Sequence, residues 1–212
     1  MSEAINAALV RRLGIVMEPD LADPREAAGV LNPAIARDPD GHLYLLPRLV
    51  AAGSYSRIGL ARVTCAPCGT PTGVQRLGVV LTPQAPYELN TRSGGGVEDP
   101  HVTYLAARGW YVMLYTAWGP AARASPPRSR AILCTGAARG SCSSPSCTAW
   151  TSPRWITKVE REGMVPGVIF PTGVDARPDG ALDVYYGMAD SRIGVARFRC
   201  DAGAALAPAQ AA

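Results

Sequence analysis

One eight-residue segment of this chain occurs twice, and this repeat limits the fold more than any other feature of the sequence. Residues 56–63 read Ser-Arg-Ile-Gly-Leu-Ala-Arg-Val, and residues 191–198 read Ser-Arg-Ile-Gly-Val-Ala-Arg-Phe. Each copy follows a Pro-Asp-Gly turn, at Pro39 and at Pro178, and then an aromatic, strand-like segment. Short strands separated by turns and repeated along a chain are typical of β-propeller blades. Two similar hairpins in a β-sandwich are the alternative.

The body of the chain also reads as β-strands. Residues 43–50, 58–63 and 74–81 are rich in strand formers and are separated by turn residues. A helix is expected only over residues 1–16, where apolar residues recur every three or four positions and Gly14 ends the pattern. The sequence therefore predicts an antiparallel all-β protein.

Composition excludes several classes of protein. A chain of 212 residues with 48% hydrophobic residues is long enough for a sizeable core. Residues 121–154 contain five arginines and no acid, more than the whole net charge of +4, so the rest of the chain has no basic excess. We therefore expect neither a nucleic-acid partner nor, in the absence of a long apolar run, a membrane span. Without a secretory signal at the N-terminus, a cytoplasmic location is expected.

The cysteines do not predict a metal centre. Cys65 and Cys68 form a single C-x-x-C pair, and the chain has only two histidines, His42 and His101. A structural zinc site needs a second pair or histidines at suitable spacing. We expect no bound metal and no disulfide framework.

A glycine-rich loop carries two adjacent acids. Residues 94–100 read Gly-Gly-Gly-Val-Glu-Asp-Pro, which places Glu98 and Asp99 between flexible glycines and a rigid proline. A carboxylate at the mouth of a strand is a reasonable catalytic acid. The alternative is a loop whose acids accept hydrogen bonds from nearby backbone N–H groups.

These motifs together resemble a known family. Residues 30–120 and 165–199 are similar to glycoside hydrolase family 130, the β-mannoside phosphorylases and related glycosidases. The matching segments are Leu31-Asn32-Pro33-Ala34, Leu46-Pro47-Arg48, Tyr55-Ser56-Arg57-Ile58-Gly59, Gly96-Val97-Glu98-Asp99-Pro100, Phe170-Pro171-Thr172-Gly173-Val174 and Tyr186-Gly187-Met188-Ala189-Asp190. The resemblance implies a five-bladed β-propeller.

The resemblance also implies a reaction and a site. The position of Asp99 is that of the general acid in an inverting cleavage of β-mannosides, with inorganic phosphate as co-substrate in a phosphorylase or water in a hydrolase. No other cofactor is implied. Arg48 and Arg57 match positions near the sugar, and Asp190 matches an aspartate that faces the central pocket. For Arg57 the alternative is a structural role that braces a blade, because Arg192 holds the equivalent position in the repeat. The resemblance places Asn32 and Glu98 among the sugar-binding residues, Glu98 as an orienting group rather than the proton donor.

The chain departs from the family pattern in two ways. His101 stands where the family has an arginine after Glu-Asp-Pro, which replaces a permanent cation with a group that titrates near neutrality. The family chain is also much longer, and the missing part is its middle. We therefore expect a truncated propeller with about three blades' worth of sequence.

Residues 121–158 fit no blade. They are rich in serine, proline and arginine, as in a low-complexity linker without a packed core. A second hypothesis is that residues from about 121 to 154 are an out-of-frame reading, followed by a deletion that rejoins the frame near Val159. The expected organisation is then residues 1–29 as helix and irregular segment, 30–120 as first blades, 121–158 as this segment, 159–200 as the last blade and 201–212 as a disordered tail.

The sequence leaves the activity open. The leading hypothesis is a carbohydrate-active protein that cleaves β-mannosides with Asp99 as acid. An inactive remnant or a sugar-binding module is the alternative, because the loss of middle blades would remove walls of the site. A propeller that only binds other proteins would explain the repeat but not the Glu-Asp-Pro motif.

Overall fold

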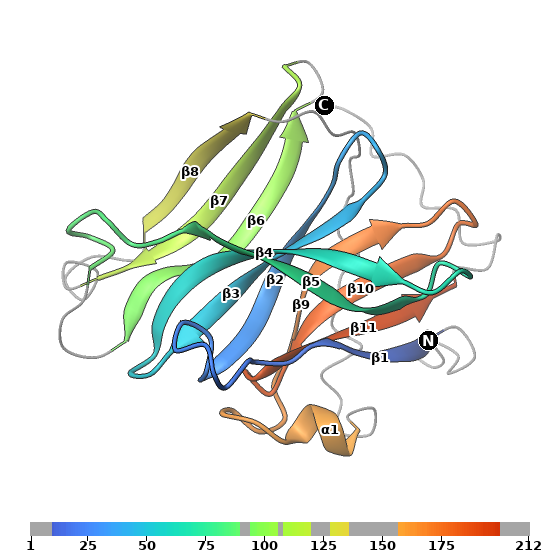
Figure 1. The fold of residues 1–212 in the computed structure, drawn as a ribbon, viewed down its shortest axis with the longest axis horizontal. Helices are drawn as coiled ribbons and strands as arrows, with labels where there is room; N and C mark the ends of the chain where they lie inside the picture. Colours follow the sequence, from blue (N-terminus) through green and yellow to red (C-terminus); the bar gives the residue numbers. More distant parts are fainter. Residues whose placement is uncertain (1–9, 90–93, 106–107, 120–127, 136–156, 200–212) are drawn as a thin grey trace, which may run out of the picture.

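The computed structural model describes residues 10–89, 94–105, 108–119, 128–135 and 157–199, and their regular elements are β-strands apart from one four-residue helix (Figure 1). None of their helices is long and apolar enough to cross a membrane. In chain order the elements are β1 (Val10–Met17), β2 (Gly29–Arg37), β3 (Leu43–Ala51), β4 (Tyr55–Cys65), β5 (Pro71–Leu81), β6 (Gly95–Leu105), β7 (Trp110–Trp118), β8 (Arg128–Thr135), α1 (Lys158–Arg161), β9 (Ile169–Ala176), β10 (Leu182–Met188) and β11 (Arg192–Phe198). The expectation of an all-β protein is confirmed.

The strands form three antiparallel groups. β2, β3, β4 and β5 follow one another as a meander, β6, β7 and β8 form a second, and β9, β10 and β11 form a third. The N-terminal strand β1 completes this third group by pairing with β11, the last strand of the described chain. Figure 1 shows the groups fanning out around the middle of the molecule. That this chain has fewer blades than the family it resembles stays a prediction.

The repeated segment is a strand in both places, as predicted. One copy lies in β4 and pairs with β3, and the other lies in β11 and pairs with β10. The turns that precede them match as well. Gly41 N donates to Asp38 O at 3.0 Å in one hairpin, and Gly180 N donates to Arg177 O at 3.0 Å in the other. Both glycines have positive φ, 84° and 76°, which such turns require.

The glycine loop joins the first two groups. β4 and β6 pair in parallel over only two positions, Tyr55 with Gly95 and Ser56 with Gly96. A Cβ at Gly96 would lie 2.2 Å from the carbonyl oxygen of Ser56, and the φ of Gly96 is +107°. Only glycine fits this close backbone approach, so the triple glycine fixes where β6 begins.

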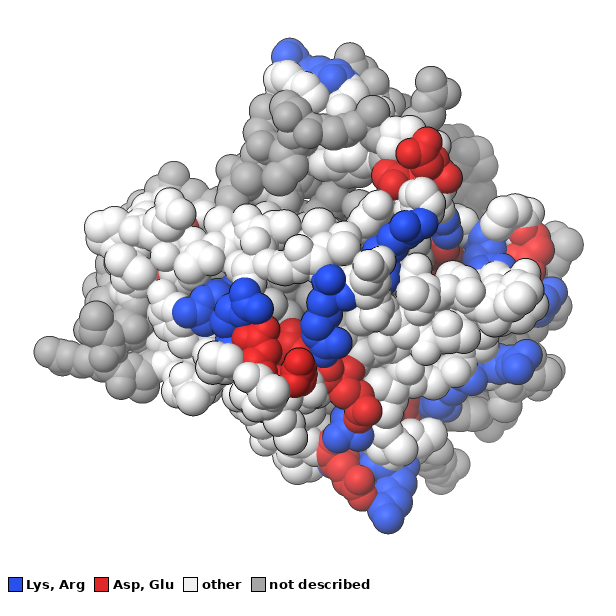
Figure 2. Space-filling model, in the orientation of Figure 1, with Lys and Arg blue, Asp and Glu red and all other residues white. Residues whose placement is uncertain are grey.

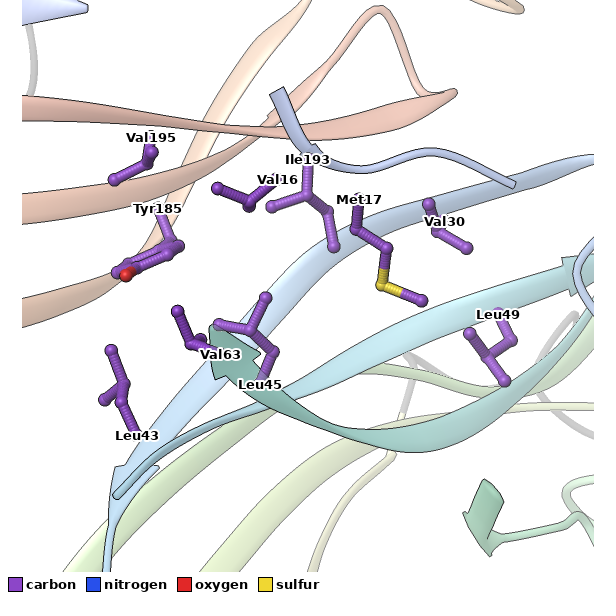
Figure 3. Close-up of a cluster of buried hydrophobic side chains, with 10 residues drawn as sticks. All are labelled: Val16, Met17, Val30, Leu43, Leu45, Leu49, Val63, Tyr185, Ile193 and Val195. Carbon is purple, nitrogen blue, oxygen red and sulfur yellow. The ribbon is translucent and has the colours of Figure 1, made fainter. Parts of the chain in front are cut away.

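The largest apolar cluster lies between the first and third groups. Figure 3 shows its side chains, which come from β1, β2, β3, β4, β10 and β11. They are Val16, Met17, Val30, Leu43, Leu45, Leu49, Val63, Tyr185, Ile193 and Val195. A second cluster, around Ile58, Val97 and Met113, packs the first group against the second. Burial of these faces holds the inner strands in register with one another.

The helix expected over residues 1–16 is wrong from residue 10 onward, where the chain forms β1. Residues 1–9 lie outside the described part. The hydrogen-bonding edge of β11 supplies β1 with six partner residues, from Ile193 to Phe198, and this pairing overrides a weak helical spacing. Gly14, expected to end a helix, instead has a φ of +120° at a register shift in the β1–β11 ladder.

The segment expected to be a low-complexity linker contains a strand. Arg128–Thr135 forms β8 and pairs along its whole length with β7. These residues form a strand because the open edge of β7 supplies backbone partners, which a composition argument does not consider. The expectation that the segment lacks a packed core of its own stays a prediction. The other residues of 121–156 lie outside the described part, and the out-of-frame origin stays a hypothesis.

Candidate functional site

Four of the six predicted site residues come together from strands β2, β3 and β6. Asn32 comes from β2, Arg48 from β3, and Glu98 and Asp99 from β6. Arg48 donates from Nη2 to Glu98 Oε1 at 2.7 Å and from Nη1 to Asp99 Oδ1 at 3.3 Å. Asn32 donates from Nδ2 to the same Asp99 oxygen at 2.8 Å. We call these four residues the carboxylate cluster.

Arg48 organises the carboxylate cluster rather than standing free for a ligand. Its third nitrogen, Nε, donates to Ser56 Oγ at 2.9 Å, so all three guanidinium nitrogens make a hydrogen bond within the protein. A planar guanidinium fixes the directions of its donors. The position of Glu98 relative to Asp99 is therefore set by one rigid group.

Ser56 belongs to the site although sequence reasoning did not select it. The residue is fully buried, and its hydroxyl lies 3.3 Å from Glu98 Oε1 while accepting the bond from Arg48. Its counterpart in the repeat, Ser191, instead accepts from Met164 N and donates to Ala189 O. The repeat marks both serines, but only the packing of β4 against β6 tells which one reaches the acids.

Three of the predicted site residues have left-handed backbones. The φ angles are 44° at Asn32, 47° at Asp99 and 50° at Asp190. Asn32 and Asp99 also lie where strand pairing shifts register, between Leu31 and Ala34 in β2 and between Glu98 and His101 in β6. Such bulges redirect a side chain, and positive φ at residues other than glycine concentrates at functional sites. The chain thus bends twice to bring Asn32 and Asp99 together.

Asn32 is confined from its other side. Its Oδ1 is buried and has no hydrogen-bond partner among the described residues. A Cβ at Gly187 would lie 2.6 Å from this oxygen. The Asn32 amide therefore occupies space that is free only because residue 187 of β10 is a glycine. This close packing connects the third group of strands to the carboxylate cluster.

Asp190 lies close enough to the carboxylate cluster to interact with it electrostatically. Burial raises the pKa of Asp190, the positive charge of Arg48 lowers it, and the negative charge of Asp99 raises it, with a net shift upward. Burial likewise raises the pKa of Glu98, an effect that Arg48 opposes. Two carboxyls beside Asp99 are therefore more easily protonated than ordinary acids.

Two other residues named from the resemblance stand apart. Arg57 lies with its guanidinium over the ring of Tyr55, 5.0 Å from the ring centroid, and no described hydrogen bond joins it to the carboxylate cluster. Successive side chains of a strand point to opposite faces, so with Ser56 facing Glu98, Arg57 faces away. His101 follows the bulge on β6 and is exposed.

A separate group of possible metal ligands lies in the β2–β3 turn. Ligand atoms of Asp38, Asp40 and His42 lie within 4.8 Å of one another. Asp38 already accepts hydrogen bonds from His42 N at 2.8 Å and from Tyr44 OH at 3.1 Å, and lies 3.0 Å from His42 Nδ1. Turn formation accounts for these residues without a metal ion.

Charges of both signs share one face of the molecule. Figure 2 shows acidic and basic side chains side by side along a line through the middle of that view, rather than a broad region of one sign. Neighbouring charges of opposite sign cancel much of each other's field at a distance.

Comparison with known proteins gives a shared fold. No protein-family model matches the chain, and no curated protein matches it significantly in sequence. Among solved structures, a β-1,2-mannobiose phosphorylase from Listeria innocua, in complex with β-1,2-mannobiose, is similar with a TM-score of 0.62 and 11% identity over 90% of this chain and 96% of that one.

Two further structures agree with this match. A glycosyl hydrolase from Bacteroides ovatus has a TM-score of 0.59 and 14% identity over 92% of each chain. A candidate glycosidase from Bacteroides thetaiotaomicron has a TM-score of 0.58 and 17% identity over 93% of this chain and 95% of that one. The chain therefore has the fold of these carbohydrate-active proteins.

Proposed function

We propose that this protein cleaves β-mannosides with inversion, using Asp99 as the general acid. The observation that carries the proposal is the geometry of Asp99, which lies on a bulge with left-handed backbone and is held by Asn32 and Arg48. Left-handed backbone at residues other than glycine is costly and is concentrated at functional sites. The shared fold with a β-1,2-mannobiose phosphorylase supports a β-mannoside as the substrate class.

The exposure of the three groups supports separate roles. The side chain of Asp99 is 31% exposed, against 15% for Glu98 and 17% for Arg48. Asp99 is thus the member that a substrate can reach, while Glu98 and Arg48 lie behind it. In this proposal Asp99 supplies the proton to the glycosidic oxygen, directly or through a sugar hydroxyl, and Arg48 and Asn32 hold its carboxyl in place.

Inversion also needs an acceptor on the opposite face of the sugar. Phosphate is nucleophilic without a base, whereas water needs a second carboxylate to take its proton. In this proposal Asp190 takes that role, since burial raises its pKa, with a smaller contribution from the charge of Asp99. The proposal therefore includes both phosphorolysis and hydrolysis.

A sugar-binding protein without turnover is the second candidate. The same partial exposure of Asp99 favours it, because a carboxyl open to water receives little help from its surroundings in transferring a proton. Amide, guanidinium and carboxylate groups close together are also what a site that binds sugar hydroxyls needs.

Incubation of the purified protein with β-1,2-mannobiose, with and without phosphate, tests these alternatives. Mannose 1-phosphate formed only with phosphate would identify a phosphorylase, and free mannose formed in both would identify a hydrolase. Binding measured by calorimetry without either product would establish the sugar-binding alternative. If the protein neither bound nor cleaved β-mannosides, the proposed function would be wrong.

A further inference from the structure

A cavity of about 260 Å³ lies away from the carboxylate cluster, between the first and third groups of strands. Its lining residues come from the ends of β2, β3, β4 and β5 on one side and from β9 and β10 and the turn between them on the other. They are Arg37, Gly41, His42, Leu43, Arg62, Val63, Cys65, Pro71, Asp175, Arg177 and Tyr185. None of them belongs to the carboxylate cluster. Exposed Gly41 and Cys65 place its mouth at the surface, while Tyr185 and Asp175 are buried at its inner side.

The lining has an excess of positive charge. It contains three arginines and one acid, Asp175. Arg37 takes up both oxygens of Asp175, with Nε donating to Oδ1 at 3.0 Å and Nη2 to Oδ2 at 2.6 Å. Asp183, which Arg177 approaches at 3.3 Å, is already held by two shorter bonds from Arg197. The charges of Arg62 and Arg177 are therefore not fully balanced inside the protein.

Three side chains at this cavity carry hydrogen-bond donors without partners among the described residues. The phenol oxygen of Tyr185 and Nε of Arg177 are both buried without a hydrogen bond, the nearest acid to that Nε being Asp179 at 3.7 Å. Arg62 likewise makes no hydrogen bond or ion pair within the described part of the chain. Figure 3 shows Tyr185 beside Leu43 and Val63, its oxygen at the edge of the apolar cluster.

Buried donors without partners are rare, because such a group loses its hydrogen bonds to water and gains none in return. Tyr185 is 0% exposed, so bulk water does not satisfy its hydroxyl. Burial and the nearby Asp175 and Asp183 raise the pKa of Tyr185 far above its usual range, so the phenol keeps its proton and acts as a donor. The cavity is several times larger than the ~30 Å³ share of one water molecule.

We propose that this cavity is a second binding site, and that it takes an anion of the phosphate class on Arg62, Arg177 and Tyr185. The planar guanidinium group can donate two parallel hydrogen bonds to two oxygens of a phosphate, whereas a spherical anion such as chloride offers no such pair of acceptors. The phenol adds a neutral donor at the inner end. The occupant is either free inorganic phosphate or the phosphate group of a small organic phosphate, because both present the same oxygens.

Calorimetric titration with inorganic phosphate, at constant ionic strength maintained with chloride, tests the proposal. Tyr185→Phe removes one donor and keeps the packing of the ring, and Arg62→Gln removes one charge. Each variant should weaken phosphate binding roughly ten- to one-hundred-fold, as expected for a hydrogen bond to a charged group. Arg11→Gln is the matched control, because Arg11 is exposed on β1. A parallel titration with mannose 1-phosphate identifies the source, since the tighter ligand of the two is the better description of the occupant.

The proposal fails if phosphate does not bind, or if Arg62→Gln and Tyr185→Phe bind it as well as the wild type and Arg11→Gln do. In either case the cavity is not a phosphate site. Arg48→Gln separates this site from the carboxylate cluster, because Arg48 is the cation of that cluster. Phosphate binding that survives Arg48→Gln but not Tyr185→Phe belongs to the cavity. Loss of binding in Arg48→Gln alone would assign the phosphate to the carboxylate cluster and overturn the inference without touching the proposed function.

Discussion

Asn32 donates its amide Nδ2 to Oδ1 of Asp99 across 2.8 Å, although 67 positions separate the two residues in the chain. The bond joins a bulge in β2 to a bulge in β6, and both residues have left-handed backbones. The place of the candidate acid is therefore decided by how two groups of strands pack, and not by the Glu-Asp-Pro motif alone.

Gly187→Ala should disturb this bond from the opposite side. The added Cβ would lie 2.6 Å from Asn32 Oδ1, and such overpacking costs about 1–3 kcal/mol. Urea denaturation should show a lower free energy of unfolding, and any cleavage of β-mannosides should slow with it. Gly73→Ala is the control, because the new Cβ there meets Thr64 Oγ1 at 3.4 Å and no positive φ is needed. Equal stability of both variants would contradict the confined position of Asn32.

Arg48→Lys and Arg57→Lys should behave differently, although the sequence resemblance treats the two arginines alike. A lysine at position 48 keeps the charge but cannot bond Ser56, Glu98 and Asp99 in fixed directions. Partly buried acceptors left without partners should cost about 1–3 kcal/mol of stability. Arg57→Lys loses only the stacking on Tyr55, and because both side chains are half-buried this is worth about 0.5–2 kcal/mol.

Thermal unfolding and sugar-binding calorimetry on the two variants measure this difference. We expect the midpoint and the affinity to fall for Arg48→Lys and to stay near wild type for Arg57→Lys. A larger loss of sugar affinity in Arg57→Lys would mean that Arg57 contacts the ligand after all.

The strand structure was largely predictable, because it depends on local patterns. Turns with glycine at positive φ, such as Gly41 and Gly180, recur before both copies of the repeat, and the strands that follow are where the repeat predicts them. The helix predicted over residues 10–16 was wrong because it was based on a local pattern alone. Helical spacing is a local signal, whereas β1 forms because the edge of β11 is available.

The carboxylate cluster was predictable only in part. The resemblance supplied Asn32, Arg48, Glu98 and Asp99, but it could not separate Arg48 from Arg57. That choice depends on register: Arg48 pairs with Ile58, which places Ser56 on the side of Glu98 and turns Arg57 away. Ser56 itself carries no sequence signal for a site, since serine in a repeated segment is equally consistent with a turn or a strand.

Asp190→Asn should change how stability depends on pH. Burial, with a contribution from Asp99, raises the folded-state pKa of Asp190 above the ordinary 3.8. The folded protein then binds the proton more tightly than the unfolded chain does, so the stabilising effect is complete below the unfolded pKa and is lost as pH rises through the folded pKa. Asparagine never ionises and tolerates the left-handed backbone at this position.

The measurement is urea denaturation of wild type and Asp190→Asn at a series of pH values, from below 3.8 upward. The difference in the free energy of unfolding, variant minus wild type, should increase as pH rises and then become constant. Exposed Asp40, replaced by asparagine, serves as the control for the substitution itself. Parallel curves for wild type and Asp190→Asn throughout would show that Asp190 is not in the environment described.

Asp99→Asn is the decisive substitution for the proposed activity. The amide keeps the size of the side chain and can still accept from Asn32, but it cannot give up a proton to a leaving oxygen. General acid catalysis contributes about 10²–10⁴-fold, so turnover of β-1,2-mannobiose should fall by that factor while sugar binding stays close to wild type. Asp40→Asn, a change of the same kind on the surface, should leave both unchanged. Release of mannose or mannose 1-phosphate at equal rates by Asp99→Asn and wild type would mean that another group donates the proton, and Glu98, with its raised pKa beside Asp99, would be the next residue to replace.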